Sequence, residues 1–288
     1  MCRFVAYSGL PLLLADLLYV PSDSLILQSY HARERREPLN GDGFGVGWYV
    51  PEIDSTPCIV RSITPAWSSS NLRHLSFKTR ASSLFAHVRA ASPGMAVTES
   101  NAHPFNCGRF MWMHNGAVAG FHRIKRKLRH GLRDKFYDMI EGTTDSEHTF
   151  ALFLNELPNL DDVDSAEMRK TLVWTIGRLN ELTREAGITA PSYYNFAVTN
   201  GEAIVVSRYC SDPDTQGASL HYAHGDCLET LPDGTCDIHS VPPSEKASAV
   251  IVASEKLNDE KSEWYDVPNN HTVTVFPDLT VKLERIEC

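Results

Sequence analysis

Short runs rich in β-branched and aromatic residues recur along the chain, and they are bounded by Gly, Pro, Asn or Asp. Such runs favour strands, and the residues that bound them favour turns. We therefore predict strands over residues 3–8, 44–50, 58–63, 83–88, 109–114, 194–199, 203–208, 219–223, 249–253, 272–276 and 280–283.

Helical patterns lie between these runs. Residues 165–186 carry an apolar stripe at helical spacing, and Gly187 follows as a residue suited to the end of a helix. A second helix is predicted to begin at Asp145 or Ser146, either of which could cap it, and to run through residue 153. Residues 71–78 form a shorter candidate.

The apolar stretch at residues 10–20 (LPLLLADLLYV) resembles the core of a signal peptide. Asp16 interrupts it and no small-residue cleavage site follows, so we interpret it as a packed helix of the fold. No run approaches the roughly 20 apolar residues of a membrane span. We therefore expect no membrane partner.

Strands, then helices, then strands again do not give a regular βαβ rhythm. This order predicts an α+β protein with largely antiparallel sheets covered by helices. No repeat, low-complexity tract or linker divides the chain.

The net charge of −9 argues against a nucleic-acid partner. A local exception is the basic run at residues 123–129 (RIKRKLR), followed by Arg133. We interpret it as a solvated helix face, the alternative being a docking patch for an acidic partner. The seven cysteines are odd in number and scattered, which indicates free thiols in a reducing compartment and a cytoplasmic location.

Cys2 is the first candidate for chemistry, because it directly follows Met1. Removal of Met1 would leave a thiol and a free α-amine on one residue, which together form a nucleophile and its base. Their ordinary pKa values, about 8.5 and about 7.7–8.0, both lie near neutrality. A cysteine at this position by chance is the alternative.

Four downstream segments could complete a site around Cys2. Arg89 stands at a strand end in LFAHVRAASPG, where its guanidinium could bind a carboxylate or form only a surface ion pair. His103, in ESNAHPF, lies in a tight loop and could be structural or functional. Asn115 and Gly116, in MHNG, could form a plain turn or supply two N–H donors to an oxyanion. Asp145, in TTDSE, could bind an ammonium group or cap a helix.

Together these residue types describe a substrate. A carboxylate held by Arg89 and an ammonium held by Asp145 form the head group of a free amino acid. A thiol beside an oxyanion site performs acyl transfer from an amide. Glutamine, or another γ-glutamyl compound, combines both features.

The ordered motifs MCRF, GDGFGVGW, HVRAAS, NAHPF, HNG and TTDSE within residues 2–150 resemble the class II glutamine amidotransferases, which are N-terminal nucleophile hydrolases. The segment IVASEKL at residues 251–257 is similar to the short stand-alone members. That branch includes the γ-glutamyl hydrolase of ergothioneine synthesis and the amidotransferase-like subunit of glutathione degradation.

The resemblance implies a single domain over residues 2–288, with a motif-bearing half (2–150) and a completing half (151–288), folded as a four-layer αββα sandwich. It implies that Cys2 attacks the γ-carbonyl to form a γ-glutamyl thioester and that its own α-amine relays the proton. Asn115 and Gly116 would hold the oxyanion, Arg89 the α-carboxylate and Asp145 the α-ammonium. His103 is assigned to substrate binding, and no cofactor is expected.

Two segments depart from the members that feed ammonia to a synthase. Residues 89–94 read RAASPG where those members carry Arg-Trp-Ala-Thr-His-Gly, and Leu39-Asn40 stands where they carry Arg-Gly. No synthase domain follows in the sequence. We therefore expect a stand-alone γ-glutamyl hydrolase. The alternatives are a glutaminase that delivers ammonia to a separate synthase and an idle γ-glutamyl-binding subunit. For any of these functions, the partners considered are a second copy of the chain and a separate synthase or peptidase subunit.

A second cluster has the residue types and short spacings of a zinc site, the alternative being a hairpin with incidental Cys and His. Its spacing does not match a standard finger, so we predict no metal there. It consists of His221, His224, Cys227, Cys236 and His239.

Overall fold

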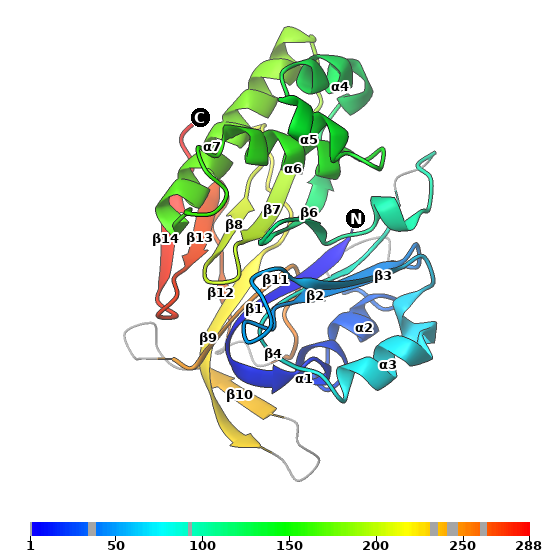
Figure 1. The fold of residues 1–288 in the computed structure, drawn as a ribbon, viewed down its shortest axis with the longest axis vertical. Coiled ribbons are helices and arrows are strands. Elements are labelled where there is room, and N and C mark those ends of the chain that lie inside the picture. Colours follow the sequence, from blue (N-terminus) through cyan, green and yellow to red (C-terminus); the bar gives the residue numbers. More distant parts are fainter. Residues whose placement is uncertain (1, 34–38, 92–93, 231–235, 241–246, 260–263) are drawn as a thin grey trace.

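The computed structural model describes residues 2–33, 39–91, 94–230, 236–240, 247–259 and 264–288, with the backbone alone at 227–230 and 236–240. Two sheets face each other, and a layer of helices covers the outer face of each (Figure 1). Every pairing between the described strands is antiparallel. The predicted α+β class and the four-layer αββα arrangement are confirmed.

The first sheet has eight described strands, in the order β10-β9-β11-β1-β4-β2-β3, with β12 also paired to β9. Their bounds are β1 (Arg3–Leu13), β2 (Phe44–Trp48), β3 (Cys58–Ser62), β4 (Arg80–Val88), β9 (His221–Thr230), β10 (Cys236–Ser240), β11 (Ala249–Ala253) and β12 (Tyr265–Asp266). The carboxyl half thus supplies β11, the neighbour of β1.

The second sheet has six described strands, in the order β14-β13-β8-β7-β6-β5. Their bounds are β5 (Phe105–Cys107), β6 (Phe110–Ala117), β7 (Tyr193–Thr199), β8 (Ile204–Arg208), β13 (His271–Val275) and β14 (Val281–Arg285). All eleven predicted strands are present, whereas β5, β10 and β12 were not predicted.

Helices of the amino half lie against the first sheet, and those of the middle of the chain lie against the second (Figure 1). The first group is α1 (Ala15–Leu18), α2 (Leu25–Gln28), α3 (Ser70–Ser76) and the 3-10 turn η1 (Ala66–Ser68). A further 3-10 turn, η2 (Glu99–Asn101), contacts the segment before α6, where the Thr143 N–H donates to Asn101 Oδ1. The second group is α4 (Phe121–His130), α5 (Asp134–Asp138), α6 (Asp145–Glu156) and α7 (Ser165–Glu185).

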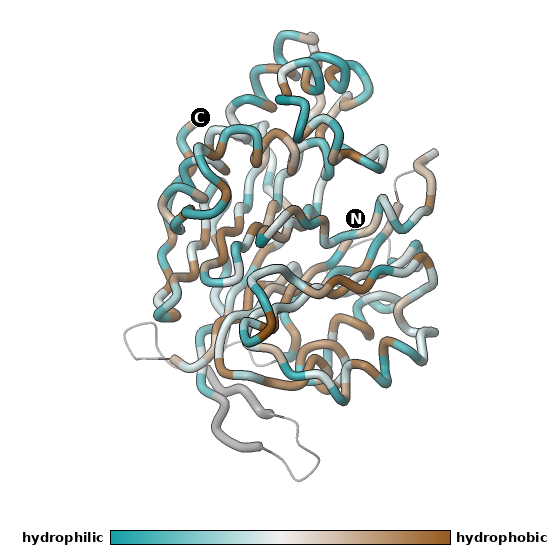
Figure 2. Tube along the Cα trace, in the orientation of Figure 1, coloured by the Kyte–Doolittle hydropathy of each residue, from teal (hydrophilic) through white to brown (hydrophobic). Residues whose placement is uncertain are grey.

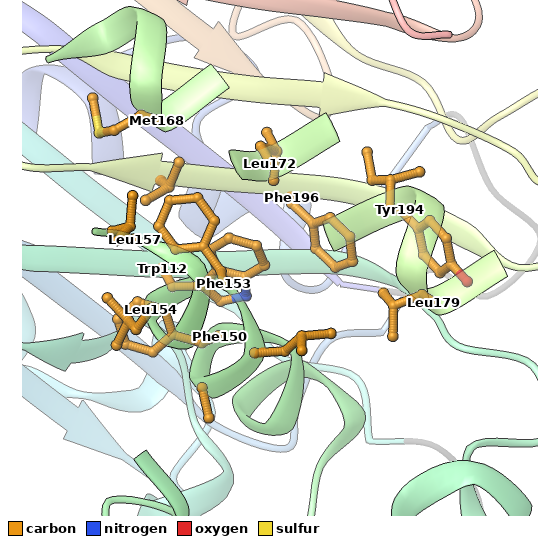
Figure 3. Close-up of a cluster of buried hydrophobic side chains, with 14 of the residues drawn as sticks. Trp112, Phe150, Phe153, Leu154, Leu157, Met168, Leu172, Leu179, Tyr194 and Phe196 are labelled. Atoms are coloured by element: carbon orange, nitrogen blue, oxygen red, sulfur yellow. The ribbon is translucent and has the colours of Figure 1, made fainter. Parts of the chain in front are cut away.

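Three apolar cores hold the layers together. The core between the sheets contains alternate residues of β1 and β4, such as Phe4, Ala6 and Phe85. Figure 2 shows the apolar residues concentrated along the strands and the nearby helices, and α4 as largely hydrophilic. Figure 3 shows the core between the second sheet and its helices, where the Trp112 ring lies 4.9 Å from that of Phe196 and 5.7 Å from that of Phe150.

Two local predictions need correction. The helix predicted over residues 10–20 is wrong, because β1 continues to Leu13, where it pairs with Arg80 of β4 after a register shift, and α1 has only four residues. The apolar residues of this run lie in the core between the first sheet and its helices. A helix could bury the same residues there, so hydrophobicity alone did not distinguish a helix from a strand. The cap of α6 is Thr144, whose side chain accepts from the Glu147 N–H, and not Asp145 or Ser146.

The predicted helix over residues 165–186 is confirmed as α7. Asp164 caps it through the Glu167 N–H, and Gly187 follows at a φ of +64°. The helix predicted over 71–78 is α3, one residue earlier at its start.

The basic run at residues 123–129 lies on α4, whose Ile124 and Leu128 are buried. The exposed side of α4 and Tyr137 together line a hollow of about 450 Å³. The lining residues from α4 are His122, Lys125, Arg126, Arg129 and His130. This agrees with the interpretation as a largely solvated helix face.

Candidate active site

Cys2 lies immediately before β1, which runs through the middle of the first sheet between β11 and β4 (Figure 1). Its side chain is partly exposed. The Sγ atom lies 3.5 Å from the backbone nitrogen of Ala90 and 3.6 Å from the Ala90 carbonyl oxygen. The fold thus brings the first candidate residue against the backbone that follows Arg89.

The surroundings of Cys2 set its protonation state. Burial raises the pKa of the Cys2 thiol, and the Ala90 backbone and the nearby Arg89 charge offset only part of that rise. The thiol therefore rests protonated at neutral pH, and a base must remove its proton before it can act as a nucleophile.

Arg89 follows directly after β4 and is only 3% exposed. Its backbone is fixed, because its N–H donates to the Gly43 carbonyl and its carbonyl accepts from the Asp42 N–H. Nη2 donates to the Ala96 carbonyl at 3.2 Å, whereas Nη1 has no hydrogen-bond partner among the described residues. A buried guanidinium with a free N–H is prepared to bind a carboxylate.

Asn115 is fully buried near the end of β6. Its Nδ2 donates to Ser254 Oγ at 3.3 Å, and its Oδ1 has no partner among the described residues. Ser254 Oγ also accepts from the Phe4 N–H at 3.1 Å. No hydrogen bond in the described part of the chain joins Cys2 to Asn115 directly, so Ser254 forms the link between their strands.

Gly116 adopts a φ of +156°, a region that residues with a side chain rarely occupy. A Cβ atom there would lie 1.9 Å from the Tyr193 carbonyl oxygen on β7 and 2.7 Å from Nε2 of His114. The close approach of β6 to β7 therefore requires glycine at this position.

We expect Gly116→Ala to lower the free energy of unfolding by at least about 2 kcal/mol, because both the backbone conformation and the contact with Tyr193 become unfavourable. Gly187→Ala is the matched control, since Gly187 also has a positive φ but a Cβ atom added to it would meet nothing within 4 Å. It should cost only about 1 kcal/mol. Urea unfolding measures both, and equal losses would contradict the steric argument.

Asp145 is the first residue of α6, and it is 9% exposed. Oδ2 accepts from the Val118 N–H at 2.8 Å and Oδ1 from the Ser146 N–H at 2.9 Å. The bond from Val118 ties α6 to the segment just after Gly116. Oδ1 also accepts from Ser146 Oγ at 3.3 Å, so the lone pair left for a further donor is on Oδ2.

His114 supports this carboxylate through Ser146. Nε2 lies 3.0 Å from the Tyr193 carbonyl, which can only accept, so we assign the ring proton to Nε2. Burial lowers the pKa of His114, so Nδ1 then accepts from Ser146 Oγ at 2.9 Å. Ser146 Oγ also lies 3.3 Å from Asp145 Oδ1, so the hydroxyl connects the His114 ring to the carboxylate.

His103 is buried beside His87 of β4, with ring centroids 4.2 Å apart, and beside Phe105 at 4.7 Å. Burial holds the pKa of His103 well below its usual range and lowers that of His87 to about 3. Both rings are therefore neutral. No hydrogen bond within the described residues joins His103 to Cys2 or Arg89, so its substrate-binding role stays a prediction.

The motifs MCRF and IVASEKL contain Arg3, Ser254 and Glu255, but they predicted no role for these residues in the site. Arg3 and Glu255 form a buried ion pair, and Arg3 Nη1 donates to the Cys2 carbonyl oxygen at 3.0 Å. The available signal was two polar residues, Ser254 and Glu255, directly after the apolar strand β11.

The predicted absence of a zinc site stays a prediction. The side chains of Cys227, Cys236 and His239 lie outside the described residues, and Nδ1 of His221 contacts Asp266 at 2.7 Å. Within the described ranges, no group of three or more His, Cys, Asp or Glu side chains is arranged to hold a metal ion. No described helix has the length and apolar character needed to cross a membrane.

Residues 12–283 match the model of the family described as glutamine amidotransferases class-II. The chain is 38% identical to the probable glutamine amidotransferase DUG3 of Saccharomyces cerevisiae, over 96% of this chain and 82% of the relative. It is 28% identical to the gamma-glutamyl-hercynylcysteine sulfoxide hydrolase of Mycolicibacterium smegmatis, over 96% of each chain.

Solved structures share the fold. A glutamine aminotransferase class-II domain protein from Silicibacter pomeroyi matches with a TM-score of 0.67 and 24% identity, covering the whole of both chains. The glutamine phosphoribosylpyrophosphate amidotransferase of B. subtilis matches with a TM-score of 0.63 and 14% identity, over 99% of this chain and 49% of that one.

Proposed function

Since the chain belongs to the class II glutamine amidotransferases, a family of amidohydrolases, we propose that it hydrolyses the γ-glutamyl amide bond of glutamine or of a γ-glutamyl conjugate, with Cys2 as the nucleophile. One observation carries this proposal. The Cys2 thiol lies against the Ala90 backbone, and the charge of the neighbouring buried Arg89 acts to lower the pKa of that thiol. Nη1 of Arg89 has no hydrogen-bond partner within the described chain.

In the proposed mechanism, removal of Met1 frees the α-amine of Cys2, which takes the thiol proton. Sγ attacks the γ-carbonyl carbon, and the carbonyl oxygen becomes an oxyanion. The α-ammonium of Cys2 then returns the proton to the leaving nitrogen as the C–N bond of the substrate breaks, which leaves a γ-glutamyl thioester on Sγ. Water then attacks the thioester and releases glutamate and the free thiol.

The head group is proposed to lie between Arg89 and Asp145. Arg89 Nη1 would donate to the α-carboxylate. The substrate's α-ammonium would donate to the lone pair that Val118 leaves free on Asp145 Oδ2. Asn115 Nδ2 and the backbone of Gly116 would stabilise the oxyanion, an effect worth on the order of 3 kcal/mol per donor.

We propose that residues 2–288 act as one catalytic domain. β11, from the carboxyl half, pairs with β1 over five residues, from Val5 opposite Ala253 to Gly9 opposite Ala249. Ser254 then contacts both Phe4 and Asn115. Free thiols at Cys2, Cys58, Cys107, Cys210 and Cys288 suit the reducing, cytoplasmic location that we propose.

A γ-glutamyl conjugate is the substrate class that we favour over glutamine. The chain aligns with 96% of a relative named as a γ-glutamyl hydrolase. Ala90 stands where the ammonia-delivering members carry tryptophan, and this smaller side chain would leave room for a larger leaving group. Delivery of ammonia to a separate synthase remains the second candidate, because another relative is named as a probable glutamine amidotransferase.

Intact mass before and after treatment with a glutamine-mimicking diazo-ketone inhibitor tests the nucleophile. We expect a chain without Met1 that gains one label at Cys2. Hydrolysis of glutamine and of γ-glutamyl thiol conjugates is then compared by kcat/KM. A higher value for the conjugates supports the hydrolase, a higher value for glutamine supports ammonia delivery, and tight binding without turnover in a chain that begins at Cys2 would overturn both.

A further inference from the structure

Ser254 and Glu255 stand where β11 ends, beside the start of β1. The pairing of the two strands continues past β11, because the Ser254 N–H donates to the Phe4 carbonyl at 3.1 Å. Both side chains are only 1% exposed. Two consecutive polar residues are thus buried next to the residue that bears the proposed nucleophile.

Glu255 connects to Cys2 through Arg3. Its Oε1 forms an ion pair with the Arg3 guanidinium, and both side chains are 1% exposed. Nη1 of the same guanidinium donates to the Cys2 carbonyl oxygen at 3.0 Å. Oε2 accepts from the Arg33 N–H at 3.1 Å, so the carboxylate is held from both sides.

This ion pair is costly to bury and is weak evidence for stability, because desolvation of two charges offsets much of their attraction. Its geometric consequence is specific. A guanidinium held by Glu255 and bonded to the Cys2 carbonyl restricts rotation about the Cα–C bond of Cys2. That rotation sets the direction of the α-amine and the thiol relative to β1.

Ser254 connects to the opposite side of the site. Its Oγ accepts from the Phe4 N–H at 3.1 Å and from Asn115 Nδ2 at 3.3 Å, which uses both lone pairs of the hydroxyl oxygen. The Asn115 amide is thereby held relative to the strand that begins at Cys2. The contact also crosses from the first sheet to the second, since Asn115 belongs to β6.

We propose that Ser254 and Glu255 are positioning residues of the reaction, with Glu255 orienting Cys2 through Arg3 and Ser254 holding Asn115 at the oxyanion position. The inference rests on the proposed function, because it needs Cys2 as the nucleophile. Neither residue touches the substrate. Their contribution is the relative placement of nucleophile and oxyanion donor, and a misplacement of about 1 Å costs on the order of a hundredfold in rate.

Glu255→Gln and Ser254→Ala test the two roles separately. We expect each to lower kcat for glutamine by about tenfold or more while KM stays within about twofold, since Arg89 and Asp145 still hold the head group. Iodoacetamide alkylates Cys2 without using an oxyanion site. Glu255→Gln should slow this alkylation, because it disturbs the orientation of the Cys2 thiol and amine. Ser254→Ala acts only on the oxyanion position, so it should leave the alkylation rate unchanged and slow only labelling by the diazo-ketone.

Labelling that is slower but still reaches one label per chain shows that the variants are folded. Glu284→Gln is the matched control. Glu284 lies on the outer strand β14, away from the site, and forms an ion pair with Arg169 of α7. This substitution should leave every rate unchanged. If Ser254 and Glu255 only stabilise the fold, part of each variant would be unfolded, and the final extent of labelling would fall in proportion to kcat. That result would overturn the inference.

Glu255→Gln leaves the Arg3 charge buried without its partner, which could prevent folding. The double variant Arg3→Met with Glu255→Met removes both charges and keeps the volume. We expect it to be fully labelled at its end point yet slowed in kcat by about tenfold or more. Wild-type rates in this variant would overturn the role of Glu255. Wild-type protein that is not labelled at Cys2 would overturn the proposed function and the inference with it.

Discussion

We expect Cys2→Ala to lower kcat by about five to six orders of magnitude, the loss that follows removal of a covalent nucleophile. Without Sγ no thioester can form, and any remaining turnover must come from the oxyanion donors and the held head group alone. The fold should persist, because Cys2 is partly exposed and the only described hydrogen bonds of its thiol are to the Ala90 backbone. Release of glutamate measures turnover, and thermal unfolding measures the fold.

Cys107→Ala is the control for this prediction. Cys107 is another partly exposed free thiol, at the end of β5, and no contact of the described chain links it to Arg89 or Ala90. Turnover should be unchanged in this variant. Retention of more than about a hundredth of the wild-type kcat by Cys2→Ala would show that the nucleophile lies elsewhere.

The sheets could be predicted because each strand carries its own local signal. Alternation places Phe4 and Ala6 of β1 in the core between the sheets and Val5 and Tyr7 in the core beneath the helices, so both faces of the strand are apolar for a definite reason. The strand pairs, by contrast, depend on contacts between distant parts of the sequence. β11 lies beside β1 although about 240 residues separate them.

The errors arise where two local structures bury the same residues. Residues 10–20 can pack as a helix or as strand and short helix, and pairing with β4 decides between them. At α6 three adjacent residues, Thr144, Asp145 and Ser146, can all cap a helix. Thr144 takes the cap because Asp145 turns its carboxylate to the Val118 N–H.

The residues proposed to act in the site could be predicted from the sequence, but the buried residues that hold them in place could not. Arg89 and Asn115 stand near strand ends in short motifs that the sequence displays directly. Cys2 and Asn115 are held by Arg3, Ser254 and Glu255, through contacts between residues that are up to about 250 positions apart. Nothing in a local pattern shows that such residues meet.

Asn115 is the residue that we expect to act mainly on the transition state. It is fully buried, and its Nδ2 is held by Ser254 before any substrate binds. A donor fixed in advance stabilises a developing oxyanion without reorganisation, which is the source of its effect on rate. The ground-state carbonyl gains little from the same donor, so KM should depend on it only weakly.

We therefore expect Asn115→Ala to lower kcat by about 10²- to 10³-fold with little change in KM. Asn200→Ala is the matched control, because Asn200 is also a buried asparagine, and its Nδ2 donates to the Val163 carbonyl at 2.9 Å. Asn200 directly follows β7, the strand that pairs with β6. That variant should lose stability but keep kcat per labelled Cys2, since Asn200 lies away from the thiol. Steady-state kinetics normalised to diazo-ketone labelling of Cys2 separate the two effects. If Asn115→Ala raised KM while kcat stayed constant, Asn115 would be a ground-state binding residue and the oxyanion would have to be stabilised by Gly116 and other donors.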